Sequence, residues 1–151
     1  MDKNFSKDKV AVITGGAKKI GRSTAKKLAN QGFNVLIHTG GKSIEEAKKT
    51  VELVKEFSVK SDVVDGDLED LKTIDKIKDA AQKLGTPSIL INNAGLRIFE
   101  DFEKIKYEDW KRVMTVNVDA SFLCTQALIG PMVKQGWGRV INIGGLSAHI
   151  G

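Results

Sequence analysis

The chain has 151 residues, of which 41% are hydrophobic and 28% are charged, and its formal net charge is +5. These values predict one globular domain with enough apolar material for a core, and they argue against disorder. Lysines are interspersed with acidic residues along helical patterns, as in 45–49 and 75–80. We therefore interpret the positive charge as a solvated surface and expect no nucleic-acid partner.

The N-terminal sequence and the cysteine content indicate the cellular compartment of the protein. The first ten residues contain no apolar signal-peptide core, and no later apolar run approaches the roughly 18 residues that span a bilayer. The one cysteine, Cys124, lies in the apolar stretch 121–128, where we expect a buried structural thiol rather than a nucleophile. A single cysteine excludes an internal disulfide and fits a reducing compartment. We expect a cytoplasmic protein with no membrane segment.

Short apolar runs alternate with helical patterns along the chain. Strands are expected at 10–14, 33–38, 59–64, 88–91 and 139–143, and helices at 19–31, 43–57, 69–84 and 107–134. Ser43 is the expected N-cap of the second helix, with Glu46 at the capping-box position. Strands joined by right-handed crossover helices predict an α/β fold, a doubly wound parallel sheet with helices on both faces.

The segment 9–21 is the most informative one, because a strand breaks there at Thr14-Gly15-Gly16 and a helix follows. Glycine lets the backbone approach a ligand, and the N-terminus of the next helix suits a pyrophosphate. However, the glycines do not spell G-x-G-x-x-G, so this turn alone does not separate cofactor binding from packing. Ligands of doubly wound sheets lie beyond the carboxyl ends of the strands. The residues at the other strand ends therefore decide whether this turn binds a cofactor.

The segments that follow the five strands are considered together, along with Asn117 in the last helix. They are TGGAKKIG at 14–21, HTG at 38–40, DGDL at 65–68, NNAG at 92–95 and GGLS at 144–147. Together they resemble the short-chain dehydrogenase/reductase superfamily, and the resemblance covers the chain from about Lys7 to its end. The nearest branches are 3-oxoacyl-carrier-protein reductases and then pteridine reductases. The resemblance implies an NAD(P)-binding Rossmann fold.

The resemblance also implies a cofactor site. Its residues would be Gly15, Lys18, Lys19, Ile20 and Gly21 at the pyrophosphate, His38, Lys42 and Ser43 near the adenosine ribose, Asp67 and Leu68 at the adenine, and Asn93, Ala94 and Gly95 at the nicotinamide-side ribose. A carboxylate after the second strand would favour NAD, but His38, Thr39 and Gly40 stand there. Nearby lysines and a serine suit a 2′-phosphate, so we expect NADP(H) over NAD(H). Alternatively, His38 is only a packing residue.

Lys19 replaces the family's usual second glycine of the turn. A non-glycine residue disfavours positive φ at that position. A similar basic pair is seen in pteridine-reductase-like and some acyl-reductase-like members of the superfamily, so the change need not abolish cofactor binding.

Carbonyl reduction in this family uses an Asn, a Ser, a Tyr and a Lys, with the Tyr as general acid. Asn117 matches the first. Gly145 stands at the usual serine position, which leaves Ser147 as the candidate. The only tyrosine, Tyr107, lies upstream of Asn117, so its spacing to Lys111 is a coincidence. We expect that 1–151 is a Rossmann domain truncated before the Tyr-x-x-x-Lys helix.

By resemblance, the function is an NADP(H)-dependent oxidoreductase that transfers a hydride between nicotinamide and a carbonyl or secondary alcohol, similar to 3-oxoacyl-thioester reductases. The alternatives are a pteridine or dihydrofolate reductase, a non-catalytic NADPH-binding member, and an inactive fragment. No metal is predicted. We expect a small-molecule substrate and, for a complete chain, a homo-oligomer. This chain alone is expected to be marginally stable, because it should expose a sheet edge and apolar surface.

Overall fold

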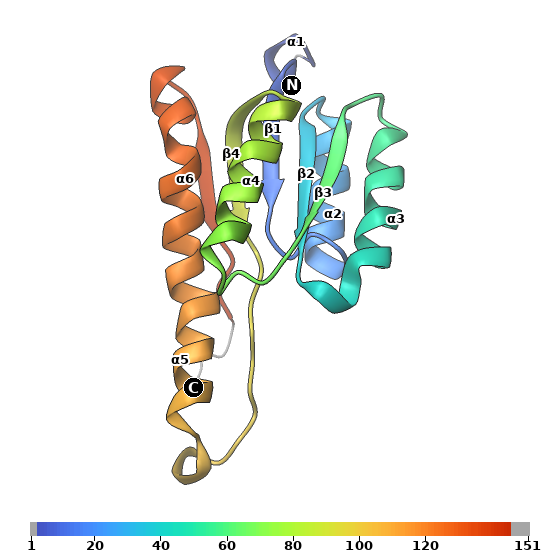
Figure 1. The fold of residues 1–151 in the computed structure, drawn as a ribbon. Helices are drawn as coiled ribbons and strands as arrows, with labels where there is room; N and C mark the ends of the chain where they lie inside the picture. Colours follow the sequence, from blue (N-terminus) through green and yellow to red (C-terminus); the bar gives the residue numbers. More distant parts are fainter. Residues whose placement is uncertain (1–2, 146–151) are drawn as a thin grey trace.

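The computed structural model describes residues 3–145, and its centre is a five-stranded sheet in the order β3-β2-β1-β4-β5 (Figure 1). The strands are β1 (Lys9–Ile13), β2 (Asn34–Thr39), β3 (Ser61–Asp65), β4 (Thr86–Asn92) and β5 (Arg139–Asn142). All four pairings are parallel. The predicted doubly wound α/β class is therefore confirmed, with strand boundaries within two residues of the expected ones.

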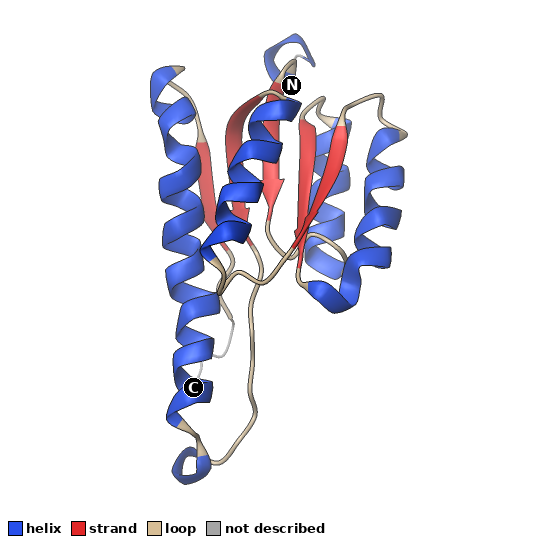
Figure 2. Ribbon diagram, in the orientation of Figure 1, coloured by secondary structure: helices blue, strands red, loops and turns tan. Residues whose placement is uncertain are grey.

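Helices cover both faces of the sheet (Figure 2). They are α2 (Lys19–Asn30) and α3 (Ile44–Lys55) on one face, and α4 (Leu71–Leu84) and α6 (Ala120–Lys134) on the other. Alternate side chains of β1 divide the core: Val10 and Val12 pack with α4 and α6, whereas Ala11 and Ile13 pack with α2 and α3. All four are fully buried, which explains why this strand has a continuous apolar sequence.

The helix that precedes β5 is longer than the sheet (Figure 1). It consists of α5 (Tyr107–Met114), a π-helical segment η3 (Thr115–Asp119) and α6. The sequence predicted one helix here but not the π-helical turn. On α6, the residues Ala120, Cys124, Leu128 and Met132 recur at every fourth position and are buried against the sheet. Cys124 is 1% exposed, which confirms the expected buried thiol.

This 28-residue helix is long and apolar enough to cross a membrane by length and composition. The expectation that no segment meets that criterion is wrong for 107–134. Apolar side chains lie on both sides of the helix. One side packs on β4, and the other exposes Phe122 and Val133, which are 62% and 72% exposed. Its place between β4 and β5 makes it the crossover helix of a parallel strand pair, a setting that requires one strongly apolar side.

Helix capping differs from the prediction at α3. Ser43 makes no capping hydrogen bond, because it ends a 3₁₀ turn, η1 (Gly41–Ser43), and Glu46 is engaged by Arg22 and Lys49 instead. The capping-box prediction is therefore wrong. By contrast, Asp70 accepts a hydrogen bond from the Lys72 amide and caps α4. Two short helices were also not predicted, namely α1 (Lys3–Ser6) and η2 (Phe102–Lys104).

Candidate functional site

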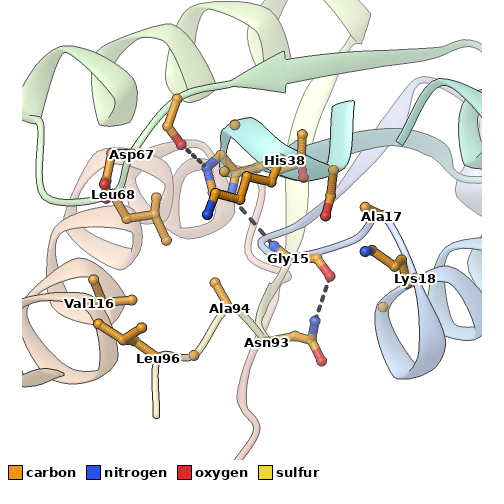
Figure 3. Close-up of a pocket in the computed structure, with 18 of the residues that line it drawn as sticks. Gly15, Ala17, Lys18, His38, Asp67, Leu68, Asn93, Ala94, Leu96 and Val116 are labelled. Atoms are coloured by element: carbon orange, nitrogen blue, oxygen red, sulfur yellow. Dashed lines mark hydrogen bonds between the residues drawn. The ribbon is translucent and has the colours of Figure 1, made fainter. Parts of the chain in front are cut away.

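A cleft of about 1010 Å³ lies beyond the carboxyl ends of β1, β2, β3 and β4 (Figure 3). Every residue predicted to bind the cofactor lines this cleft. They are Gly15, Lys18, Lys19, Ile20, Gly21, His38, Lys42, Ser43, Asp67, Leu68, Asn93, Ala94 and Gly95. The fold thus brings together residues from four separate segments of the sequence, at the edge where parallel sheets bind ligands.

Further lining residues were not predicted as site residues. They are Ala17, Thr39, Gly40, Gly41, Asp65, Gly66, Leu96, Arg112 and Val116. Most are direct neighbours of predicted residues, so the strand ends already pointed to them. Arg112 and Val116 come from α5 and η3, far along the chain. Only the folded chain places them at the cleft.

Two glycines of the β1–α2 turn have no space for a side chain. Gly15 has φ +63°, and an added Cβ would lie 2.9 Å from the Ala94 Cα. An added Cβ on Gly21 would lie 2.5 Å from the carbonyl oxygen of Gly15 and 2.7 Å from the Cα of Gly16. These are backbone atoms, which cannot move aside as a flexible side chain can. The turn therefore requires glycine at both positions.

The ends of β1 and β4 are joined by reciprocal hydrogen bonds. The Thr14 hydroxyl oxygen accepts from the amides of Asn93 and Ala94, both at 3.0 Å. In return, the Asn93 side-chain nitrogen donates to the carbonyls of Thr14 and Gly15, both at 3.0 Å. Asn93 thus lines the cleft and also fixes the glycine turn. Thr14 was not predicted as a site residue, although it follows β1 directly.

Lys19 adopts the left-handed backbone conformation, with φ +48°. The expectation that a lysine would avoid positive φ here is wrong, because the close packing of Gly15 against Gly21 dictates the path of the turn. Such a conformation costs a residue with a Cβ about 1–2 kcal/mol. Among residues 3–145, no carboxylate forms an ion pair with Lys18, Lys19 or Lys42.

The turn is supported from behind by a network centred on Arg22. Its guanidinium donates to the Ala17 carbonyl at 2.8 Å, to the Thr50 hydroxyl at 2.8 Å and to the Glu46 carboxylate at 2.7 Å. The buried Thr50 hydroxyl also donates to Ala17, at 2.9 Å. Hydrogen bonds from Lys49 and Arg22 lower the pKa of Glu46 to about 2. The network ties the turn to α3 and was not apparent from the sequence.

His38 is buried, with 2% of its surface exposed. Its Nε2 lies 3.0 Å from the Gly66 carbonyl oxygen, and its Nδ1 accepts the Gly15 amide at 3.5 Å (Figure 3). An accepting Nδ1 and a donating Nε2 define the neutral Nε2–H tautomer. Burial lowers the pKa of His38, whereas the Gly66 carbonyl and the charges of Asp65 and Asp67 act in the opposite direction. A contact between His38 and the cofactor stays a prediction.

The adenine end of the predicted site carries an ionic contact across the cleft. The guanidinium of Arg112 donates to the Glu69 carboxylate at 2.8 Å and lies 3.7 Å from the Asp67 carboxylate. Asp67 also accepts the Glu69 amide at 3.1 Å. These contacts link α5 to the β3–α4 loop. Because Arg112 and Asp67 are both about half exposed, we expect the link to be weak.

Asn117, predicted to be catalytic, lies in η3 and holds the loop that follows β4. Its side chain accepts the Leu96 amide at 2.8 Å and donates to the Leu96 carbonyl at 3.0 Å. Asn117 itself does not line the cleft, but Leu96 does. Its predicted role in catalysis stays a prediction. Ser147, the other predicted catalytic residue, lies outside the described residues, and Gly145 is the last residue described.

The sequence of residues 9–151 matches the family described as short chain dehydrogenase. The chain belongs to this family. Curated relatives in the short-chain dehydrogenase family include the L-rhamnose 1-dehydrogenase (NADP(+)) of Thermoplasma acidophilum, which is 37% identical over 147 residues. They also include the 3-oxoacyl-[acyl-carrier-protein] reductase FabG of Aquifex aeolicus, which is 36% identical over 145 residues.

A solved structure agrees with this assignment. The crystal structure of acetoin dehydrogenase YohF from Salmonella typhimurium superposes with a TM-score of 0.88 at 33% identity and covers 94% of this chain. The two curated relatives are matched over 96% and 95% of this chain, respectively. The chain spans somewhat over half the length of its relatives: 58% of each of the two enzymes and 56% of the crystal structure.

Proposed function

We propose that the chain forms the cofactor-binding part of an NADP(H)-dependent oxidoreductase, which transfers a hydride between nicotinamide and a carbonyl or secondary alcohol. The observation that carries this proposal is the cleft at the strand ends, which all the predicted cofactor residues line. Its volume of about 1010 Å³ is at the upper end for ligand pockets, as an extended dinucleotide needs. Family membership supports the same reaction class.

The turn has the features of a pyrophosphate cradle. Gly15 and Gly21 line the cleft, and because they carry no side chain the turn can pack tightly against itself and against Ala94, which fixes the backbone that faces the ligand. The N-terminus of α2 faces the same cleft, where its free amides and the positive end of its dipole favour an anion. Lys18 and Lys19 add positive charge beside it.

A preference for NADP(H) is supported by the groups near the end of β2. His38, Thr39 and Gly40 stand where a carboxylate would select NAD, and Lys42 and Ser43 line the cleft just beyond them. An ammonium and a hydroxyl suit a 2′-phosphate. The name of the L-rhamnose 1-dehydrogenase relative specifies NADP(+).

When bound, the cofactor supplies the hydride. The residues of this chain would then bind and orient it: the β1–α2 turn at the pyrophosphate, Asp67 and Leu68 at the adenine, and Ala94 and Gly95 at the nicotinamide-side ribose. Asn117 would fix the loop that borders this last position, through its two hydrogen bonds to Leu96. We propose an acyl-thioester or other small carbonyl compound as the substrate, by analogy with the FabG relative.

We also propose that the complete protein is a homo-oligomer. Large apolar side chains recur at helical spacing along the outer side of α5, η3 and α6. They are Tyr107, Trp110, Met114, Val118 and Phe122, each between 37% and 69% exposed. An apolar stripe of this size favours burial against another protein surface.

Calorimetric titration with NADPH and with NADH tests the cofactor assignment. The chain should bind NADPH more tightly, and Lys42→Ala should weaken NADPH binding about tenfold while leaving NADH binding unchanged, because only NADPH carries the 2′-phosphate. Lys55→Ala is the control, since Lys55 lies on α3 and does not line the cleft. Equal affinities for both nucleotides, or equal effects of the two variants, would contradict the preference.

A further inference from the structure

We propose that His38 is a positioning residue, which holds the glycine turn against the β3–α4 loop and does so only as a neutral imidazole. This inference rests on the proposed cofactor site but concerns a residue that need not touch the cofactor. His38 would set the shape of the cleft by joining Gly15 to Gly66.

The geometry places His38 between two loops. Its Nδ1 accepts the Gly15 amide at 3.5 Å on one side, and its Nε2 lies 3.0 Å from the Gly66 carbonyl on the other (Figure 3). The backbone repeats the link, because the Gly16 amide donates to the His38 carbonyl at 3.0 Å and the Gly66 amide donates to the Thr39 carbonyl at 3.1 Å. The imidazole therefore completes a continuous connection across three strand ends.

Gly15 is a sensitive position for such a connection. It has φ +63°, it lies against Ala94, and its carbonyl accepts from Asn93. Its amide and carbonyl are thus held by side chains from β2 and from the end of β4, respectively. Movement of this one residue would displace the turn that faces the proposed pyrophosphate position.

Protonation would break one of the two side-chain contacts. A proton on Nδ1 would point at the Gly15 amide, so two donors would face each other, while the Nε2 contact to Gly66 would persist. The imidazolium would also be a buried charge. The carboxylates that act on His38 are Asp65 and Asp67 after β3, and both favour protonation, but burial outweighs them. Lys18 and Lys42 line the same cleft, but the charges that act on His38 are those of the two carboxylates.

The first test is the tautomer of His38, read by long-range ¹H–¹⁵N NMR of the imidazole ring. The chain has two histidines, and His149→Ala leaves His38 as the only signal. We expect the Nε2–H tautomer at pH 7 and a titration midpoint below 6.5. An Nδ1–H tautomer, or a charged ring at pH 7, would overturn the proposal. This measurement needs no cofactor, so it stands apart from the proposed function.

The second test compares NADP⁺ affinity in the wild type and in His38→Asn, between pH 8 and about one pH unit below the His38 midpoint that NMR measures in the first test. Asn can accept and donate but does not titrate in this range. The 2′-phosphate itself titrates near pH 6, an effect that both proteins share. On acidification, the wild type should lose about threefold to tenfold more affinity than the variant, which is the effect of one hydrogen bond.

Each outcome of this comparison bears on a separate claim. Parallel pH profiles in the two proteins would overturn the positioning role of His38. Absence of NADP⁺ binding by the folded wild type at pH 8 would contradict the proposed function, and the tautomer measurement would still decide the role of His38. If His38→Asn does not fold, His38→Gln serves the same comparison.

Discussion

Gly21 lies so close to Gly15 that an added Cβ would sit 2.5 Å from the Gly15 carbonyl oxygen. Gly21→Ala should therefore force the turn open and lower the free energy of unfolding by about 1–3 kcal/mol. Gly130→Ala is the matched control, because Gly130 lies in α6 with nothing within 4 Å of an added Cβ. It should raise stability by up to about 1 kcal/mol. Urea unfolding measures both, and equal effects of the two substitutions would refute the close approach.

Thr14 carries the reciprocal bond between β1 and β4. Thr14→Val removes the hydroxyl that accepts the Asn93 and Ala94 amides and leaves both without this partner. We expect a loss of about 1–3 kcal/mol in the free energy of unfolding. Thr14→Ser keeps the hydroxyl and should retain most of that stability. Denaturant unfolding of the two variants checks the assignment, which fails if valine is tolerated as well as serine.

Glu46 should make stability depend on pH in the acid range. Its pKa is lowered to about 2 in the folded chain, from an ordinary value of 4.5. A lowered folded-state pKa stabilises the fold above the unfolded value, and this contribution is lost as the pH falls from about 4.5 through 2. Glu46→Gln should therefore flatten the fall in Tm between these pH values.

The control for this experiment is Glu45→Gln. Glu45 is an exposed neighbour that pairs only with Lys48 among the described residues. Thermal unfolding from pH 6 to pH 2 compares the variants. If Tm falls with decreasing pH in Glu46→Gln as steeply as in the wild type, Arg22 and Lys49 do not stabilise the carboxylate in solution.

Cys124 should be inert in the folded chain. It is 1% exposed, and burial raises the pKa of its thiol to about 11, so little thiolate exists at pH 8. A thiol reagent such as dithionitrobenzoate should not react at pH 8 until guanidinium unfolds the chain, and one thiol should then react. Fast labelling without denaturant would contradict the packing of α6 on the sheet.

Local patterns in the sequence predicted the fold and the edge of the sheet where the cleft lies, whereas the individual cleft residues came from the resemblance to the short-chain dehydrogenase/reductase superfamily. Buried parallel strands are continuous apolar runs, and glycine, Asp and Asn at their ends mark the edge where a ligand binds. The contacts of Arg112 with Glu69 and of Arg22 with Thr50 escaped prediction, since each joins segments far apart in the sequence whose mutual placement only the tertiary structure fixes.

Lys19 and Ser43 show the same limit at single residues. Local preference disfavours positive φ for Lys19 and favours Ser43 as a cap, yet the packing of the turn and the 3₁₀ entry to α3 override both. The resemblance named Asn117 from its register, but its two contacts to Leu96 required the structure.

The central claim is that the cleft at the strand ends is a dinucleotide site, and NMR mapping of NADP⁺ binding tests it most directly. Amide signals of the ¹⁵N-labelled chain would be followed during titration. We predict saturable shifts concentrated at Gly15, Gly21, Ser43, Asp67 and Gly95, with the outer side of α6 unaffected. A folded chain that shows no shifts at these residues, or whose shifts cluster elsewhere, would contradict the account.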